Sequence, residues 1–183
     1  MKITDTNIEG CFAINFQKHI DDRGAFVKTF NRDMLIETDL KNFSLEEEYY
    51  SSSNKNVFRG FHFQKPPHDH NKYVYCISGK VIDYFIDIRI DSITYGEIGT
   101  VKLGLGNDRS DAIYLPRGIA HGFFSEEDDS TLVYKTDSKY HPESDDGFNY
   151  RYFADKLNLK NPNISKRDSS FIDFLEFISP FKK

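Results

Sequence analysis

Short segments rich in aromatic and β-branched residues follow one another along most of this chain, with turn-forming residues between them. Such residues favour strands over helices, and short strands at regular spacing are typical of an antiparallel sandwich or barrel. The segments span 10–17, 25–30, 43–51, 56–63, 72–78, 81–89, 97–103, 111–115, 119–124 and 130–137. We therefore expect an all-β fold.

The clearest alternation lies at 81–89. One face carries only apolar or aromatic side chains, whereas the other includes Asp83, Asp87 and Arg89. Gly79 and Lys80 precede the segment, as a tight hairpin requires. A strand face with these charges can be solvated or can line a polar cavity, and the alternation does not distinguish the two.

Helical patterns are scarce. The segment 32–37 is long enough for one or two turns, and the tail from Ser165 places Phe171, Phe174 and Leu175 where a short packed helix would bury them. Ser165 or Asp168 is a suitable cap for that helix. With 183 residues and no linker, we expect one domain over 1–183, with N-terminal strands at 1–55, a barrel core at 56–140 and a C-terminal extension at 141–183.

The charge and the cysteine content constrain which partners the protein can bind and in which cellular compartment it is expected. The net charge of −5 argues against a general electrostatic attraction to nucleic acid or to an anionic membrane. Cys11 and Cys76 match no metal or redox spacing, and a protein with two free cysteines fits the cytoplasm. The start of the chain lacks a signal-peptide pattern, and no apolar stretch approaches the length of a membrane span.

Three of the six histidines, His62, His68 and His70, lie close together. A His-x-His pair on a β-rich chain suggests a metal site, but no glutamate follows at the needed spacing and Lys72 occupies that region. We therefore expect no bound catalytic metal, and we expect His68 and His70 to lie in a solvated loop. His62 is flanked by two phenylalanines on a predicted strand, where a half-buried histidine bonded to a backbone carbonyl is the simplest interpretation.

Several motifs in order along the chain resemble the dTDP-4-dehydrorhamnose 3,5-epimerase family. The resemblance runs from about 21–24 to 164–168. It rests on Arg59-Gly-Phe-His-Phe-Gln64, Lys72, Gly79-Lys-Val-Ile-Asp83 with Asp87-Ile-Arg89, Pro116-x-Gly-x-Ala-His-Gly-Phe123, Tyr134-Lys135 and Tyr140-x-Pro142.

This resemblance implies a metal-free cupin, which is a jelly-roll β-barrel with a few short helices, including a C-terminal one. It also implies a homodimer that needs no cofactor. The implied reaction inverts C3, C5 or both carbons of a nucleotide-linked 4-keto-6-deoxy sugar in deoxysugar or surface-polysaccharide biosynthesis. The reaction removes a proton next to the C4 ketone, forms an enolate and returns a proton to the opposite face.

The resemblance also assigns catalytic roles. His62 corresponds to the general base, and an imidazole that titrates near neutral pH suits that role. Asp168 corresponds to the carboxylate that fixes its tautomer. Lys72 would stabilise the developing C4 oxyanion, and Tyr134 would return the proton on the opposite face.

Binding roles follow in the same way. Arg59, His121 and Arg23 are expected to bind the diphosphate, with Arg23 reaching either its own site or a neighbouring subunit's. We include three further residues in the predicted substrate site, namely Gln64, Glu47 and Tyr140. Strict alternation places Arg59 and His62 on opposite strand faces, so both reach one site only if Gly60 allows a twist or bulge.

The sequence departs from the family where nucleotide-reading amides are usual. Glu46-Glu47-Glu48 replaces them, and Lys28 stands where a glutamate is common. A carboxylate only accepts hydrogen bonds, so it suits an exocyclic amine on cytosine or guanine. A CDP- or GDP-sugar substrate is therefore an alternative. Because proton delivery depends on the pose of the sugar, a single-carbon epimerase and a ketoisomerase are also alternatives. A non-catalytic sugar-nucleotide binding module is a further one.

Overall fold

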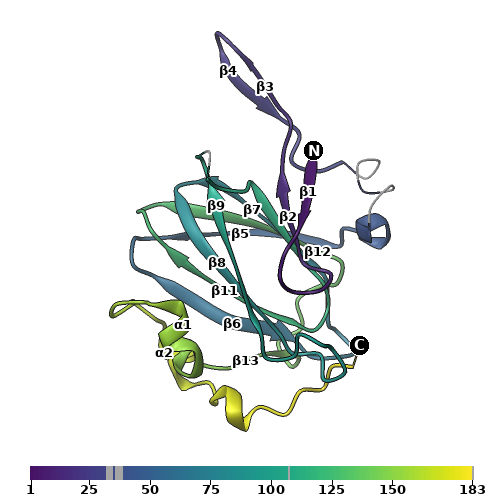
Figure 1. Cartoon of the computed structure of the whole chain (residues 1–183), viewed down its shortest axis with the longest axis vertical. Helices are drawn as coiled ribbons and strands as arrows, with labels where there is room; N and C mark the ends of the chain where they lie inside the picture. Colours follow the sequence, from purple (N-terminus) through teal and green to yellow (C-terminus); the bar gives the residue numbers. More distant parts are fainter. Residues whose placement is uncertain (32–34, 36–38, 107, 183) are drawn as a thin grey trace.

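Two antiparallel sheets face each other, and a separate hairpin projects from them (Figure 1). The computed structural model describes residues 1–31, 35, 39–106 and 108–182. One sheet has the order β1-β2-β10-β7-β12-β5 and the other the order β13-β6-β11-β8-β9, whereas β3 and β4 pair only with each other. All pairings between these named strands are antiparallel. Two facing sheets with this mixed strand order form the expected jelly roll.

The predicted strand segments are found, with small shifts at their ends. The strands of the first sheet are β1 (Lys2–Asp5), β2 (Phe12–Asn15), β10 (Ala112–Leu115), β7 (Lys72–Ser78), β12 (Ser130–Thr136) and β5 (Glu47–Ser53). Those of the second are β13 (Asp145–Gly147), β6 (Phe58–Gln64), β11 (Ile119–Ser125), β8 (Lys80–Asp87) and β9 (Ile98–Gly104), and the hairpin consists of β3 (Lys18–Asp21) and β4 (Gly24–Val27). β1, β3 and β13 were not predicted.

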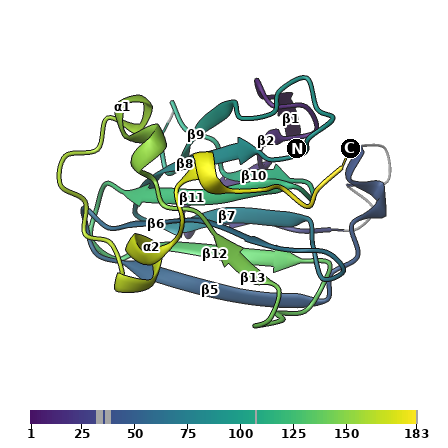
Figure 2. The same cartoon turned by 90° about the horizontal axis from the view of Figure 1, so that it is seen from below.

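Three apolar layers hold these elements together. Side chains such as Val74, Phe85 and Leu132 fill the space between the sheets. The C-terminal segment packs over the outer face of the second sheet (Figure 2), where Phe58 and Phe148 are fully buried. A third cluster covers the outer face of the first sheet and includes Phe12, Phe43 and Tyr73. Each buried aromatic or branched side chain contributes about 1.5–3 kcal/mol.

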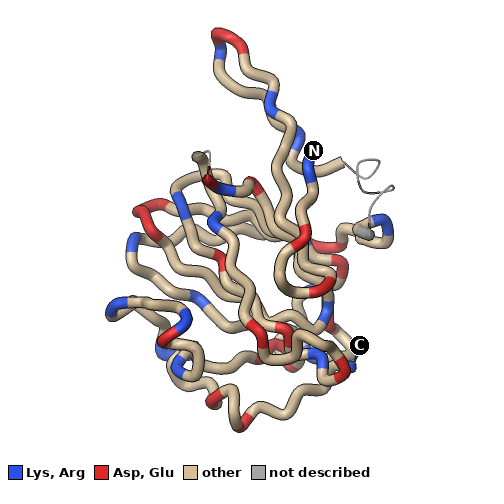
Figure 3. Tube along the Cα trace, in the orientation of Figure 1, with Lys and Arg blue, Asp and Glu red and all other residues tan. Residues whose placement is uncertain are grey.

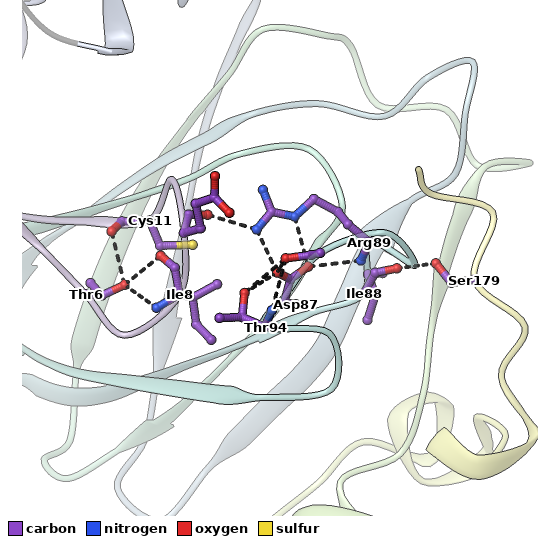
Figure 4. Close-up of polar contacts among 10 residues, drawn as sticks. Thr6, Ile8, Cys11, Asp87, Ile88, Arg89, Thr94 and Ser179 are labelled. Atoms are coloured by element: carbon purple, nitrogen blue, oxygen red, sulfur yellow. Dashed lines mark hydrogen bonds and ion pairs between the residues drawn. The ribbon is translucent and has the colours of Figure 1, made fainter. Parts of the chain in front are cut away.

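This layering resolves the ambiguity at 81–89. Because β8 lies between the inner core and the C-terminal segment, both of its faces are buried, and Asp83 is on the face directed between the sheets. Asp87 and Arg89 are also buried rather than solvated. The Asp87 carboxylate accepts hydrogen bonds from Arg89, Ser92 and Thr94, as Figure 4 shows for Arg89 and Thr94.

Within the described residues, helical structure is limited to short turns. They are η2 (Asp39–Asn42), η3 (Arg151–Phe153), α1 (Ala154–Leu157), α2 (Lys166–Ser170) and η4 (Phe174–Glu176). The helix expected at 32–37 lies outside the described residues, apart from Leu35. No helix in the described ranges is long and apolar enough to cross a membrane.

The C-terminal helix is shorter than predicted. α2 ends at Ser170 because Phe171 is extended, so Phe174 belongs to the separate turn η4 and remains buried. The expectation that Leu175 packs inward is wrong, since its side chain is 74% exposed. The predicted cap at Ser165 is confirmed, because its hydroxyl oxygen accepts from the Asp168 backbone N–H at 3.0 Å.

Candidate active site

A pocket of about 360 Å³ is lined by residues of both sheets. β5, β6, β7, β11 and β12 each contribute a polar side chain to it. The lining residues are Glu47, Tyr49, Ser51, Arg59, His62, Phe63, Gln64, His70, Lys72, His121, Phe123, Tyr134, Tyr140, Asp145 and Arg167. Nine of the ten residues expected from the sequence therefore lie in or directly beside this pocket, with Asp168 reaching it through His62.

His62 and Asp168 form a hydrogen-bonded pair. The His62 Nε2 atom lies 2.9 Å from one carboxylate oxygen of Asp168, and the other oxygen accepts from the Gly60 backbone N–H at 3.1 Å. Burial alone would raise the pKa of Asp168, but the hydrogen bond and charge interaction with His62, together with the hydrogen bonds to Gly60 and Ser165, outweigh burial and lower that pKa. The ionised carboxylate then holds the proton on Nε2, which leaves Nδ1 as the nitrogen able to accept one.

A bulge brings Arg59 and His62 to the same pocket. The register between β6 and β11 shifts between His121 and Phe123, opposite His62 and Arg59. Gly60 lies within the shift with a φ of +138°, and a Cβ there would lie 2.5 Å from the Gly122 Cα. The predicted bulge at Gly60 is confirmed, and only glycine satisfies both constraints.

Lys72 is a buried ammonium group beside His62. Its Nζ donates to the His62 backbone carbonyl at 3.1 Å. Burial lowers the pKa of Lys72 to about 8, and the nearby Asp145 and Asp83 carboxylates only partly offset that effect. A cation held in a low-dielectric pocket stabilises a neighbouring oxyanion more strongly than it would in water.

Tyr134 lies in the pocket as a protonated phenol. Its hydroxyl is 3.2 Å from the Ser51 Oγ, and its ring stacks on Tyr49 with 4.8 Å between centroids. Burial raises the pKa of Tyr134 well above its usual value, more than the Ser51 hydrogen bond lowers it. The hydroxyl therefore has a proton to donate at neutral pH.

His121 has a partner that the sequence did not reveal. Its Nε2 lies 2.7 Å from the Asp83 Oδ2, and both residues are buried. Burial raises the pKa of Asp83, and its Oδ1 has no hydrogen-bond partner in the described part of the chain. The pocket thus contains a second histidine–aspartate pair on β11 and β8.

The remaining predicted binding residues hold the pocket rim together. Gln64 donates to the His68 carbonyl and accepts from the His141 backbone N–H, at 2.8 and 2.6 Å. The Glu47 carboxylate accepts from the Tyr140 backbone N–H at 2.6 Å. Arg59 donates through Nε to the Ser53 hydroxyl at 3.0 Å.

Arg23 is the predicted residue that does not reach this pocket. It lies on the projecting hairpin, where it pairs with Asp21, and its side chain is 86% exposed. The tip of the hairpin carries both acidic and basic residues (Figure 3). Arg23 therefore does not line the pocket of its own subunit.

Sequence reasoning missed other pocket residues. His70, expected in a solvated loop, lines the pocket, and burial together with the positive charge of Lys72 lowers its pKa to about 3. Asp145 and Arg167 form an ion pair at the pocket wall, and the Tyr140 hydroxyl donates to the same Asp145 oxygen at 3.1 Å. Arg167 precedes Asp168, so the motif itself pointed to this segment.

An imidazole hydrogen-bonded to a carboxylate, a buried cation and a protonated phenol around one pocket can shift protons on a carbon next to a ketone. Together with the jelly roll, this site defines a sugar-nucleotide epimerase, an isomerase of deoxysugar biosynthesis. The chain belongs to the dTDP-4-dehydrorhamnose 3,5-epimerase family, whose model matches residues 5–176.

Individual relatives agree with this assignment. A dTDP-4-dehydrorhamnose 3,5-epimerase of Shigella flexneri is 32% identical, over 97% of this chain and 100% of the relative. A dTDP-4-dehydrorhamnose 3-epimerase of Streptomyces niveus is 34% identical over 80% of this chain and 70% of the relative. A Legionella pneumophila dTDP-6-deoxy-D-glucose-3,5-epimerase, solved with dTDP-4-keto-L-rhamnose, has a TM-score of 0.88 and 27% identity, covering 100% of this chain and 98% of the other.

Proposed function

We propose that this enzyme inverts both C3 and C5 of a dTDP-linked 4-keto-6-deoxyhexose. The observation that carries the proposal is the hydrogen bond between His62 and Asp168 at the wall of a pocket that also holds Lys72 and Tyr134. A non-catalytic binding module has no need for an oriented base together with a proton donor. The relatives support a dTDP-sugar, since their names refer to dTDP.

The reaction begins when His62 Nδ1 takes the proton from a carbon next to the C4 ketone. Asp168 stabilises the imidazolium that forms, as the acid does in other histidine–aspartate pairs. The electron pair moves to the C4 oxygen, where the Lys72 ammonium group stabilises the enolate. The Tyr134 hydroxyl then donates a proton from the opposite face, and Ser51 is positioned to hold that hydroxyl in place.

For substrate binding, we propose that Arg59 and the partner subunit's Arg23 bind the diphosphate. We place His121 beside the sugar, because it is buried and its Nε2 already contacts the Asp83 carboxylate. Gln64 and Tyr140 would shape the rim against the sugar. The Glu47 carboxylate accepts a hydrogen bond from the Tyr140 backbone N–H. This contact accounts for a glutamate at position 47, so no amine on the nucleotide base is needed to explain it.

A homodimer and a cytoplasmic location complete the proposal. Ile20 and Phe26 on the β3–β4 hairpin are 77% and 62% exposed. A two-stranded hairpin with exposed apolar side chains is marginally stable alone, so a second copy of the chain is its natural partner. The cytoplasmic location fits the two free cysteines, because a reducing compartment keeps thiols from forming disulfides.

Proton exchange with solvent tests the reaction. The enzyme is incubated in D2O with a dTDP-4-keto-6-deoxy sugar, and deuterium is located by NMR against a no-enzyme control. We expect deuterium at both C3 and C5. Label at one carbon would indicate a single-carbon epimerase, a moved ketone would indicate a ketoisomerase, and no label above the control would indicate a binding module.

Calorimetry with dTDP-, CDP- and GDP-sugars tests the nucleotide separately. We expect clear preference for the dTDP-sugar. Tighter binding of the CDP- or GDP-sugar would contradict this choice and would restore a base-reading role for Glu47.

A further inference from the structure

Two histidines and a glutamate lie close together near the pocket-lining residues His70 and Tyr140, outside the residues used in the reaction. His68 lies in the loop that follows β6, whereas His141 and Glu143 lie between β12 and β13. Their ligand atoms all lie within 4.8 Å of one another. The Glu143 Oε1 is 3.3 Å from the His141 Nδ1 and 3.9 Å from the His68 Nε2.

The separation between Glu143 and His141 already fits a tetrahedral metal ion, and His68 lies 0.6 Å further from Glu143 than His141 does. Zn–N and Zn–O bonds of about 2.0–2.1 Å place neighbouring ligand atoms about 3.3 Å apart. The His68 and His141 rings stack with 3.5 Å between centroids, at an interplanar angle of 11°. Because a ring nitrogen binds a metal in the plane of its ring, the two stacked rings must rotate apart before both can bind one ion. The partly exposed His68 and the exposed Glu143 have room to rotate.

The backbone that carries these ligands is already held in place. Gln64 donates to the His68 carbonyl and accepts from the His141 backbone N–H, so one side chain joins the two loops. The His68 N–H also donates to the Lys65 carbonyl at 3.1 Å, which closes a turn in the loop. Binding an ion would therefore require little rearrangement of the backbone.

We propose that His68, His141 and Glu143 form a binding site for a divalent transition metal of the zinc class. Two imidazoles and one carboxylate suit Zn²⁺, Cu²⁺ or Ni²⁺, whereas Mg²⁺ and Ca²⁺ prefer oxygen ligands. None of the three ligands belongs to the proton-transfer machinery, so the ion has no part in the epimerisation. A bound ion would link the loop after β6 to the segment between β12 and β13.

Titration of the full chain, prepared without a histidine tag, with Zn²⁺ alone against a competing chromogenic chelator tests the site. We expect one equivalent to bind, with affinity reduced by ~10-fold or more in His68→Ala, His141→Ala and Glu143→Gln, since each loses a ligand. Matched controls are His19→Ala on the exposed hairpin and Cys76→Ser, both of which should bind like the wild type. Mg²⁺ should not compete.

Two further measurements keep this test independent of folding and of activity. Without metal, the variants should melt at the wild-type temperature, and Zn²⁺ should raise the Tm of the wild type but not of His68→Ala. Co²⁺ should give a tetrahedral visible spectrum that His141→Ala lacks. Absence of binding, unchanged affinity in folded His68→Ala and His141→Ala variants, or loss of binding in a control variant would each overturn the proposal.

Discussion

The His62 ring meets the carboxylate of Asp168, a residue 106 positions away in the sequence. Their identities could be predicted because both lie in motifs of the family. The partner of His121 could not be predicted, because that contact depends on how β8 and β11 align. Alternation left Asp83 free to face solvent or a cavity, and only the packing of the C-terminal segment over β8 buries both faces of that strand.

His70 illustrates a second limit at the residue scale. A histidine two residues after another in a proline-rich stretch is typical of a solvated loop. Here Gln64 Nε2 lies 2.9 Å from the His70 Nδ1 and draws the ring into the pocket wall. The sequence holds no periodic signal for such a contact, since it joins a strand to an irregular loop.

Lys72 should impose an alkaline limit on activity. In the proposed mechanism the ammonium form of Lys72 stabilises the enolate, and this form is lost as the pH rises through the Lys72 pKa of about 8. We therefore expect kcat/KM to fall above about pH 8, while kcat falls at higher pH because the bound anionic substrate favours the charged form. A pH–rate profile measures both.

The matched variants for this prediction are Lys72→Met and Lys65→Met. Lys72→Met should lose activity by roughly 10²–10³-fold, as when one oxyanion-stabilising group is removed. Lys65 pairs with Asp146 and is 41% exposed, so its replacement should leave the profile unchanged. An alkaline limit that persists in Lys72→Met would assign that titration to another group.

At the scale of elements, the strands that form the pocket walls were the easiest to predict. β6 to β12 are rich in buried β-branched and aromatic residues, and β7 has the predicted bounds. β1 and β3 are exposed and polar, and β13 has three residues, so none of them carries an apolar alternation. The C-terminal helix was overestimated because Phe171 and Phe174 have a helical spacing although the chain is extended between them.

The bulge in β6 supplies a test at this scale. A Cβ at Gly60 meets the Gly122 backbone and forces a strained φ, so Gly60→Ala should destabilise the fold by about 2 kcal/mol or more and misplace His62. Urea unfolding measures the change in the free energy of unfolding. Gly24→Ala is the matched control, because its φ is also positive but no atom lies within 4 Å of the added Cβ. Equal effects of the two substitutions would show that the close approach to Gly122 is unimportant.

At the scale of the whole molecule, the projecting hairpin places Arg23 far from its own pocket in a direction that a second subunit could occupy. If Arg23 completes the partner's site, Arg23→Ala and His62→Ala chains should complement each other. Each variant alone should be nearly inactive. With random pairing, about half of the dimers in a co-expressed mixture contain one chain of each kind, and each such dimer has one intact site of two. We therefore expect about a quarter of the wild-type activity per chain. A mixture no more active than its components would exclude sharing of Arg23 between subunits.

The central claim is that His62, oriented by Asp168, removes the proton next to the ketone. The most direct measurement is the initial rate of deuterium incorporation from D2O into the sugar nucleotide by the wild type, His62→Asn and Asp168→Asn, with circular dichroism melts as the folding control. We predict folded variants in which His62→Asn abolishes exchange at both carbons and Asp168→Asn slows it by roughly 10²–10⁴-fold. Exchange at the wild-type rate in a folded His62→Asn variant would contradict the account.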